Sequence, residues 1–302
     1  MQDKGILVAG YGKLGQRVAQ QLATKHQVTA LKRSPQAPEQ NVHLCFADVT
    51  QPEKLSQCLQ QNLPEGVDYL IYCLSPSERS EQGYRAAYVN GLKNVLAALP
   101  NSTRLKHVIF VSSTSVFHQS EHEWVDEQTP CQPSSFAGKV LLEAEQFLQQ
   151  QAVATSVVRF SGIYGGGRSR LIEQVRQALL SGSSLAVAEG FSNRIHEDDC
   201  VGFLCHLMDL LDQGKRLEPL YIATDSEPVA LAEVYQFISE QLQAGLAAQE
   251  KRPLQLEHNP EANKQRRAGS KRCCNGLLLK SGYALKYPSY REGYAGCRAA
   301  LS

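Results

Sequence analysis

The chain has 302 residues, a formal net charge of +1 and 20% charged residues, an ordinary composition for a globular protein. The near-neutral charge gives no reason to expect a nucleic acid or an anionic membrane as partner. No apolar run approaches the ~20 residues that span a bilayer. The N-terminus leads directly into a predicted strand, without the pattern of a signal peptide. We therefore expect a cytoplasmic protein, monomer or homodimer, whose partner is a small-molecule substrate.

The cysteines give no evidence of a metal or disulfide scaffold. There are nine of them, an odd number, and no C-x-x-C pair occurs. We expect most of them to be small apolar residues in a reducing compartment. No spacing of ligand residues supports a metal enzyme, so no metal is predicted.

A glycine-rich turn follows the first predicted strand, residues 5–9. The turn has the pattern G-x-G-x-x-G, and Leu14, Val18 and Leu22 then recur at the spacing of a helix face. In this context the glycines allow a tight turn, a close approach to a pyrophosphate, and close packing of helix on strand. The helix start then offers free N–H groups to the phosphates. The alternative is a chance glycine cluster in a loop. The residues predicted to bind a dinucleotide here are Gly10, Tyr11, Gly12, Lys13, Leu14 and Gly15.

Basic residues follow the second predicted strand, residues 28–31. An enzyme that prefers NAD usually has an acidic residue about 20 positions after the glycines, and this chain has Lys32 and Arg33 instead. Two cations suit a 2′-phosphate, which Arg binds bidentately. The pattern therefore favours NADP(H), with NAD(H) possible; the alternative is a solvated pair of surface side chains.

Three further positions at predicted strand ends are expected to contact the cofactor. A third strand, residues 42–47, ends at Asp48 and Val49, and a fourth, residues 67–74, ends at Leu74. The carboxylate of Asp48 either accepts from an adenine amino group or caps the next helix, around residues 52–59.

The remaining elements continue the alternation of strands and helices. Strands are predicted at 107–111 and 155–160, helices at 88–99 and 139–150, and a polar loop at 78–83. Such alternation predicts an α/β fold with a Rossmann-type doubly wound parallel sheet, which binds ligands beyond the carboxyl ends of its strands.

From about residue 168 the pattern loosens. Helices are predicted at 171–180, 199–211 and 231–242, and short strands at 185–187 and 220–223. We expect residues 1–167 to form an NAD(P)-binding domain. Residues 168–302 would form a smaller carboxyl-terminal α/β substrate lobe interleaved with that core.

Taken together, these motifs resemble the extended short-chain dehydrogenase/reductase (SDR) superfamily, in its NAD-dependent epimerase/dehydratase branch. The resemblance covers nearly the whole chain. The motifs that carry it are Gly10-x-Gly12-x-x-Gly15, Asp48-Val49 and the segments 88–95, 112–117, 159–165 and 194–199.

The resemblance implies a catalytic Ser, Tyr and Lys. Ser113 matches the serine and Lys139 the lysine, which in the family also holds the nicotinamide ribose. The residue four positions before Lys139 is Ser135, where the family has Tyr, and Phe136 beside it lacks a hydroxyl. A phenol has a pKa near 10, whereas an aliphatic hydroxyl is a poorer acid or base near neutrality.

Three interpretations of this departure stay open. A phenol from elsewhere, Tyr164 or Tyr84, supplies the proton; the reaction needs no such group; or the site binds cofactor without turnover. The pattern looks most like the atypical members of the superfamily. We assign Ser113, Lys139 and Tyr164 to catalysis and Ser135 to substrate binding.

Our leading hypothesis is an NADP(H)-dependent oxidoreductase or an epimerase/dehydratase-like enzyme acting on a small polar metabolite, with sugar-like and anionic compounds as candidates. The competing hypothesis is a non-catalytic NAD(P)-binding redox sensor or regulatory protein. Arg194, together with Arg168, is expected to face an anionic group of the substrate. The alternative is that Arg194 only pairs with Asp198 or Asp199. His196 is interpreted as structural.

Overall fold

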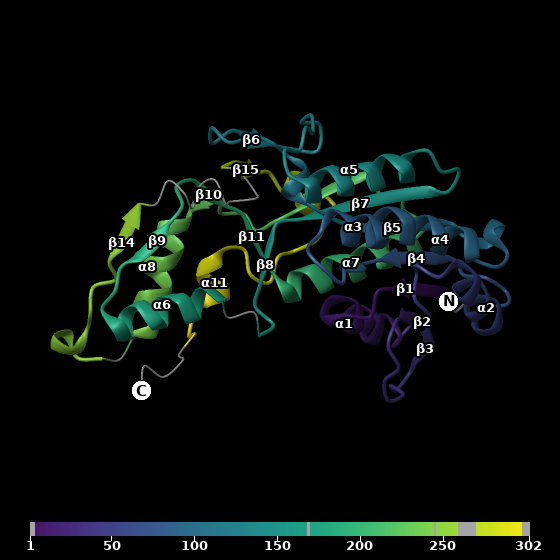
Figure 1. Cartoon of the computed structure of the whole chain (residues 1–302), viewed down its shortest axis with the longest axis horizontal. Coiled ribbons are helices and arrows are strands. Elements are labelled where there is room, and N and C mark those ends of the chain that lie inside the picture. The colour runs from purple at the N-terminus through teal and green to yellow at the C-terminus, as the bar shows by residue number, and fades with distance from the viewer. Residues whose placement is uncertain (1–3, 168–169, 245, 259–269, 298–302) are drawn as a thin grey trace. The chain divides into compact units, whose positions relative to one another are not determined.

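The computed structural model describes residues 4–167, 170–244, 246–258 and 270–297 (Figure 1). Contacts divide the chain into two compact units. Unit 1 comprises Met1–Val116, Cys131–Arg159 and Val201–Tyr221, and unit 2 comprises Phe117–Pro130, Phe160–Cys200 and Ile222–Ser302. The chain therefore passes several times between the units. The predicted boundary after residue 167 stays a prediction, and each unit is described by itself.

Unit 1 is built on a seven-stranded parallel sheet in the order β12-β7-β5-β4-β1-β2-β3. The chain runs outward from β1 to β3 and then returns to add β4 on the other side of β1. This creates the switch point beside which such sheets bind ligands. The predicted fold class is confirmed. The strands are β1 (Gly5–Ala9), β2 (Gln27–Lys32), β3 (Val42–Phe46), β4 (Tyr69–Tyr72), β5 (His107–Ser113), β7 (Ala154–Phe160) and β12 (Leu220–Ala223).

The inner strands are apolar along their length because helices flank the sheet. All four residues of β4 are buried, and so are four of the five in β1, which is typical of strands covered on both faces. The helical segments that include unit 1 residues are α1 (Lys13–Leu22), α2 (Pro52–Asn62), α3 (Glu81–Tyr84), the π-helical η1 (Arg85–Asn90), α4 (Gly91–Ala98), η2 (Ser102–Arg104), η3 (Thr114–Val116), α5 (Phe136–Gln149) and α7 (Glu197–Asp212).

Unit 2 contains short paired strands and a helical core of its own. α6 and α8 pack together, with Val175, Leu179, Val234 and Ile238 among their buried residues. The remaining elements are β6 (Trp124–Val125), β8 (Gly162–Tyr164), α6 (Arg170–Ser181), β9 (Leu185–Val187), β10 (Phe191–Ser192), β11 (Arg194–His196), β13 (Val229–Ala230), α8 (Leu231–Leu242), η4 (Ala248–Glu250), β14 (Leu256–His258), β15 (Arg272–Cys273), α10 (Gly276–Lys280) and α11 (Tyr290–Tyr294). None of the described helices combines the length and apolar character needed to cross a bilayer.

Two local predictions are wrong. The segment 78–83 was predicted to be a loop, but α3 begins at Glu81 because the Ser80 hydroxyl caps it by accepting from the Gly83 amide at 3.0 Å. A disulfide also joins Cys45 on β3 to Cys58 on α2, although no disulfide was predicted. Successive elements of one β-α unit bring these two cysteines together, which the odd cysteine count did not reveal.

Candidate functional site

The glycine-rich turn links β1 to α1 as its spacing predicted. Gly10 has φ +109°, and a Cβ there would lie 2.7 Å from the Leu74 amide nitrogen on the neighbouring strand end. A Cβ on Gly15 would lie 1.8 Å from the Gly10 carbonyl oxygen, so only glycine lets α1 pack this close to the turn. Gly12, the N-cap residue of α1, instead faces open space: nothing described lies within 4 Å of its Cβ position. The turn thus leaves room for a ligand at the helix start.

A cleft of about 270 Å³ opens at the carboxyl ends of β1, β2 and β4. It lies where α/β sheets of this topology bind dinucleotides. Eight of the predicted cofactor residues line it: Gly10, Tyr11, Gly12, Lys32, Arg33, Asp48, Val49 and Leu74. Lys13, Leu14 and Gly15 form the first turn of α1 and do not line the cleft themselves. A second hollow, of about 640 Å³, is lined by residues at the amino ends of β1 and β2 and by Glu39.

Asp48 holds a turn at the edge of this cleft. Its Oδ1 accepts from the Thr50 amide at 2.9 Å and the Thr50 hydroxyl at 2.7 Å. The N-cap position of α2 belongs to Gln51, so Asp48 does not cap that helix directly. Burial raises the pKa of Asp48, but the two bonds from Thr50 and the charge of Arg33 outweigh it and leave the pKa below its ordinary value. Asp48 is therefore a carboxylate at neutral pH.

The residues that were predicted to be catalytic belong to two different units. Ser113 ends β5, where its hydroxyl accepts from the Ser115 amide at 3.2 Å, and the exposed Lys139 lies in the first turns of α5. Ser135 is the N-cap of α5, and its Oγ accepts from the Gly138 amide at 3.1 Å. Its own hydroxyl hydrogen is not used in that bond. Ser113, Ser135 and Lys139 belong to unit 1, and Tyr164 belongs to unit 2.

A buried ionic cluster ties α5 to β5 and β7. The Ser112 hydroxyl donates to Glu145 Oε1 at 2.5 Å, and Arg159 Nη2 donates to Glu145 Oε2 at 2.6 Å. Arg159 and Glu145 are 5% and 1% exposed. Because Ser112 precedes Ser113 and Glu145 shares a helix with Lys139, this cluster fixes the backbones that carry both predicted catalytic residues.

Tyr84, the other phenol considered from the sequence, lies against α5. Its ring meets the Phe136 ring edge-on, with centroids 5.4 Å apart, and the Tyr88 ring at 5.5 Å. Tyr84 follows Gly83, which lines the cleft, and precedes the π-helical η1. Single π-helical turns often mark functional positions. Tyr84 belongs to unit 1, as do Ser113 and Lys139.

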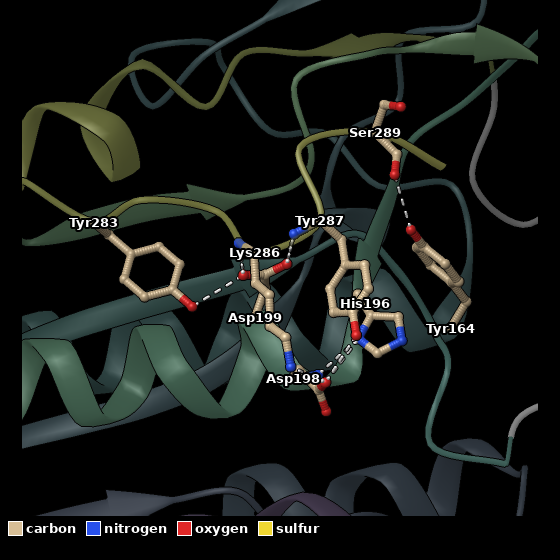
Figure 2. A network of polar contacts seen from close by, with 8 residues as sticks. All are labelled: Tyr164, His196, Asp198, Asp199, Tyr283, Lys286, Tyr287 and Ser289. Atoms are coloured by element: carbon tan, nitrogen blue, oxygen red, sulfur yellow. Dashed lines mark hydrogen bonds and ion pairs between the residues drawn. The ribbon is translucent and has the colours of Figure 1, made fainter. Parts of the chain in front are cut away.

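Tyr164 is 3% exposed, and both its hydroxyl and its ring contact other residues of unit 2. Its hydroxyl donates to the Ser289 carbonyl at 3.3 Å, as the dashed line in Figure 2 shows. Its ring stacks on Tyr294 with centroids 4.7 Å apart. Burial, with the charge of Asp225, raises the pKa of Tyr164 well above its ordinary value. These contacts favour a structural role, and the assignment of Tyr164 as proton donor stays a prediction.

Two acidic residues at the start of α7 hold the segment 283–287 (Figure 2). Asp199 accepts from the Tyr283 hydroxyl at 3.0 Å and from the amides of Lys286 and Tyr287 at 2.7 and 3.0 Å. Asp198 accepts from the Lys286 ammonium at 3.2 Å and the Tyr287 hydroxyl at 3.3 Å. Both carboxylates thus have partners other than Arg194.

His196 lies in the same network and makes structural contacts. Its Nδ1 accepts from the Asp198 amide at 3.1 Å, and its ring packs on the Tyr287 ring with centroids 3.8 Å apart. Burial lowers the pKa of His196. A neutral ring used as an acceptor and a packing surface agrees with the structural interpretation of this histidine.

Arg194 and Asp225 are buried charged residues on adjacent backbones in unit 2. Arg194 Nη1 donates to the Tyr294 hydroxyl at 3.4 Å, while its buried Nε has no hydrogen-bond partner in the described structure. Asp225 is 1% exposed, and burial raises its pKa to about 8 despite the opposing charge of Arg194. Its backbone amide donates to the Arg194 carbonyl at 2.6 Å, so the two backbones are adjacent. Sequence reasoning missed Asp225, and Arg168 lies outside the described residues.

The sheet order, the glycine turn with its cleft, and the placement of Ser113 and Lys139 define a Rossmann-type protein of the atypical SDR class. The chain belongs to the RmlD substrate binding domain family, whose model matches residues 4–299. A comparison with curated proteins gives no significant match.

Solved structures show the same fold over the whole chain. A candidate NAD-dependent epimerase/dehydratase from Methylobacillus flagellatus is 36% identical, with a TM-score of 0.75 and 96% of each chain covered. The Bordetella bronchiseptica enzyme WbmG in complex with NAD and UDP is 16% identical, with a TM-score of 0.77, 98% of this chain and 94% of that one covered. The Thermotoga maritima UDP-glucose 4-epimerase with UDP-glucose is 14% identical, with a TM-score of 0.74, 97% and 96% covered.

Proposed function

We propose that this protein is an NADP(H)-dependent oxidoreductase or epimerase/dehydratase-like enzyme that acts on a small anionic metabolite of the nucleotide-sugar class. The observation that carries the proposal is the cleft at the glycine turn, which is lined by Lys32 and Arg33. The family membership and the candidate epimerase/dehydratase at 36% identity support the same class of activity.

The residues of the cleft fit a dinucleotide. The open space at Gly12 accommodates a pyrophosphate, and the free amides at the start of α1 donate to it. The guanidinium of Arg33 and the ammonium of Lys32 neutralise a 2′-phosphate. The bound cofactor would supply the hydride acceptor or donor, while the chain orients it and provides the proton-transfer groups.

Ser113 and Lys139 are the proposed proton-handling and orienting groups in unit 1. The Ser113 hydroxyl would hold a substrate oxygen, and Lys139 would hold the nicotinamide ribose and favour the ionised form of a nearby phenol. For that phenol we favour Tyr84 over Tyr164. The ring of Tyr84 lies against Phe136, next to Ser135 where the family tyrosine is missing, whereas the Tyr164 hydroxyl already donates to Ser289.

An anionic substrate is supported by Arg194. Its Nε is buried without a partner among the described residues, and such a group costs free energy unless a ligand satisfies it. Two similar folds were solved with UDP or UDP-glucose bound. The proposed ligand is therefore a nucleoside diphosphate carrying a sugar.

A non-catalytic redox sensor is the second candidate, favoured by the replacement of the family tyrosine with Ser135. The two functions differ in what happens to the bound nicotinamide. The test is to load the protein with NADP⁺ or NADPH, add a panel of UDP- and dTDP-sugars, and follow absorbance at 340 nm. Products are identified by chromatography and NMR, because epimers have the same mass.

If the protein is an enzyme, the 340-nm absorbance changes or a sugar is converted, and Lys139→Ala abolishes the reaction. Lys93→Ala is the matched control, because Lys93 lies on α4 and its ammonium packs over the Phe147 ring near the carboxyl end of α5. Tight cofactor binding with no conversion of any sugar would contradict the enzyme and favour the sensor.

A further inference from the structure

An acidic residue that the sequence analysis did not identify is linked through hydrogen bonds to the predicted 2′-phosphate site. Glu39 belongs to the loop between β2 and β3, and its carboxylate accepts four hydrogen bonds. Oε1 accepts from the Gln16 and Gln36 side-chain amides, both at 2.7 Å. Oε2 accepts from the Tyr11 hydroxyl at 2.5 Å and the Gln20 side-chain amide at 2.7 Å. One carboxylate thus joins the glycine turn, two turns of α1 and its own loop.

This arrangement leaves Glu39 no acceptor site for a ribose. An ionised carboxylate has about four lone-pair positions, and all four are used by protein donors. Glu39 lies in the loop after β2, beyond the strand-end position where an NAD-type enzyme has its ribose-binding acid and where this chain has Lys32 and Arg33. The hydrogen bonds from Tyr11 and the three glutamines keep the pKa of Glu39 below its ordinary value, so it stays ionised.

The same cluster reaches the basic side of the cleft through Gln36. The Gln36 amide nitrogen donates to Glu39, and its carbonyl oxygen accepts from the Lys32 ammonium. An ammonium has three donor hydrogens, so this bond leaves two for a phosphate. Fixing a lysine side chain costs conformational entropy, and a side chain already fixed before binding does not add that cost to the binding free energy.

Tyr11 connects the cluster to the glycine turn of the cleft. Tyr11 is 6% exposed and lies between Gly10 and Gly12 in the turn. Tyr11, Lys32 and Arg33 all line the cleft. Glu39 therefore holds both the residue beside the pyrophosphate position and, through Gln36, one of the two cations.

We propose that Glu39 is a specificity-determining positioning residue, which selects a 2′-phosphorylated dinucleotide by fixing Lys32 through Gln36 and Tyr11 through its hydroxyl. The proposal rests on the proposed NADP(H) function. The expected effect is opposite to simple charge repulsion. The Glu39 carboxylate strengthens binding of the phosphate, because its hydrogen bonds to protein donors hold the binding residues in place.

The test is calorimetric titration of NADPH and NADH into wild type, Glu39→Gln and Gln36→Ala, with hydrogen exchange of residues 33–41. Glu39→Gln removes a negative charge, so Coulomb's law alone predicts tighter NADPH binding. The proposal predicts the opposite: about tenfold weaker NADPH binding, or about 1.4 kcal/mol, NADH within about twofold, and faster exchange. Gln36→Ala should lower the NADPH preference as well. Gln20→Ala is the control, because it removes one exposed donor and leaves the path to Lys32 intact.

The outcomes separate the two proposals. A wild type that binds NADPH and NADH equally overturns the NADP(H) function and this proposal with it. A wild type that prefers NADPH, with the same preference in Glu39→Gln and Gln36→Ala, overturns this proposal alone. Equal weakening of both cofactors in the variants shows that Glu39 only supports the turn, and unchanged exchange at 33–41 shows that it does not position the loop.

Discussion

Arg159 on β7 and Glu145 on α5 form a buried ion pair, with Arg159 Nη2 2.6 Å from Glu145 Oε2. Arg159 Nε also donates to both carboxylate oxygens, at 3.1 and 3.2 Å, which is a bifurcated hydrogen bond. The pair links the helix of Lys139 to the sheet that carries Ser113. Both charges are buried, so the hydrogen bonds between them must offset the free energy lost when each group leaves water.

We predict that Glu145→Ala lowers the free energy of unfolding by about 3–5 kcal/mol, because it leaves the Arg159 charge buried and unpaired. Glu143→Ala is the control on the same helix. Glu143 and Arg85 are 42% and 45% exposed, and exposed pairs contribute about 0–1 kcal/mol. Urea denaturation of both variants checks this. Similar losses for the two variants would contradict the account of the buried pair.

The phenol assignment predicts different results for two tyrosine variants. If Tyr84 transfers the proton, Tyr84→Phe should lower kcat by about 10²–10⁴-fold, with cofactor affinity unchanged. Tyr164→Phe should keep kcat and lose about 0.5–1.5 kcal/mol of stability, since it removes one hydrogen bond to Ser289. Steady-state kinetics on whichever sugar is converted decides between them. Loss of activity in Tyr164→Phe alone would support the original assignment.

Restoring the missing family tyrosine is expected to destabilise the protein. Ser135→Tyr places a phenol four residues before Lys139, but it removes the hydroxyl that caps α5. We expect a loss of about 1 kcal/mol in unfolding free energy, unchanged cofactor affinity, and a higher background reductase rate. Thermal unfolding and an NADPH oxidation assay measure the two effects. An unchanged melting temperature would show that the cap contributes little.

The raised pKa of Asp225 predicts a dependence of stability on pH. Its folded-state value of about 8 lies above the ordinary 3.8, so the folded protein holds a proton that the unfolded chain releases. Stability from this group is therefore greatest below pH ~4 and falls by up to about 1.4 kcal/mol per unit as pH rises toward 8. Asp225→Asn should remove this fall.

The measurement is the melting temperature of wild type and Asp225→Asn at several pH values between 4.5 and 8. The variant should gain on wild type as pH rises. Asp209→Asn is the control, because Asp209 is exposed and pairs with Lys25. If Asp225→Asn follows wild type at every pH, Asp225 is not held protonated in the folded state.

The proposed substrate charge predicts a thermal shift that depends on Arg194. In the presence of NADPH, UDP should stabilise the protein and uridine should not; a ligand at 100 times its Kd adds about 2.7 kcal/mol. The shift should shrink in Arg194→Ala and persist in Arg216→Ala, which alters an exposed arginine. Equal shifts with UDP and uridine, or an unchanged response in Arg194→Ala, would assign Arg194 a structural role.

The parts of the fold that the sequence predicted well are those governed by local patterns. The β1 run, the three glycines and the helix periodicity lie within 22 residues, so their geometry follows from neighbouring positions. The bounds of β12 and α8 also match the predicted ranges. Turn chemistry was less predictable: α3 depends on one serine cap, and the segment in which it begins was expected to be a loop.

Long-range contacts could not be predicted from these patterns. The donors to Glu39 lie 3 to 28 residues away, and glutamines carry no charge pattern that would reveal a common acceptor. The partners of Asp199 lie 84 to 88 residues further along the chain. Such contacts are set by tertiary packing, which is why the role of Asp198 and Asp199 in holding the segment 283–287 was not foreseen.

The central claim is that the cleft at the glycine turn selects NADPH through its basic residues. Calorimetric titration of NADPH and NADH into wild type, Arg33→Ala and Lys25→Ala tests it most directly. Losing a charge-assisted contact costs about 1.5–3 kcal/mol, so Arg33→Ala should weaken NADPH by roughly one to two orders of magnitude and leave NADH nearly unchanged. Lys25→Ala, which removes an exposed cation paired with Asp209, should behave as wild type. Equal affinities of the wild type for the two cofactors, or unchanged NADPH binding in Arg33→Ala, would contradict the claim.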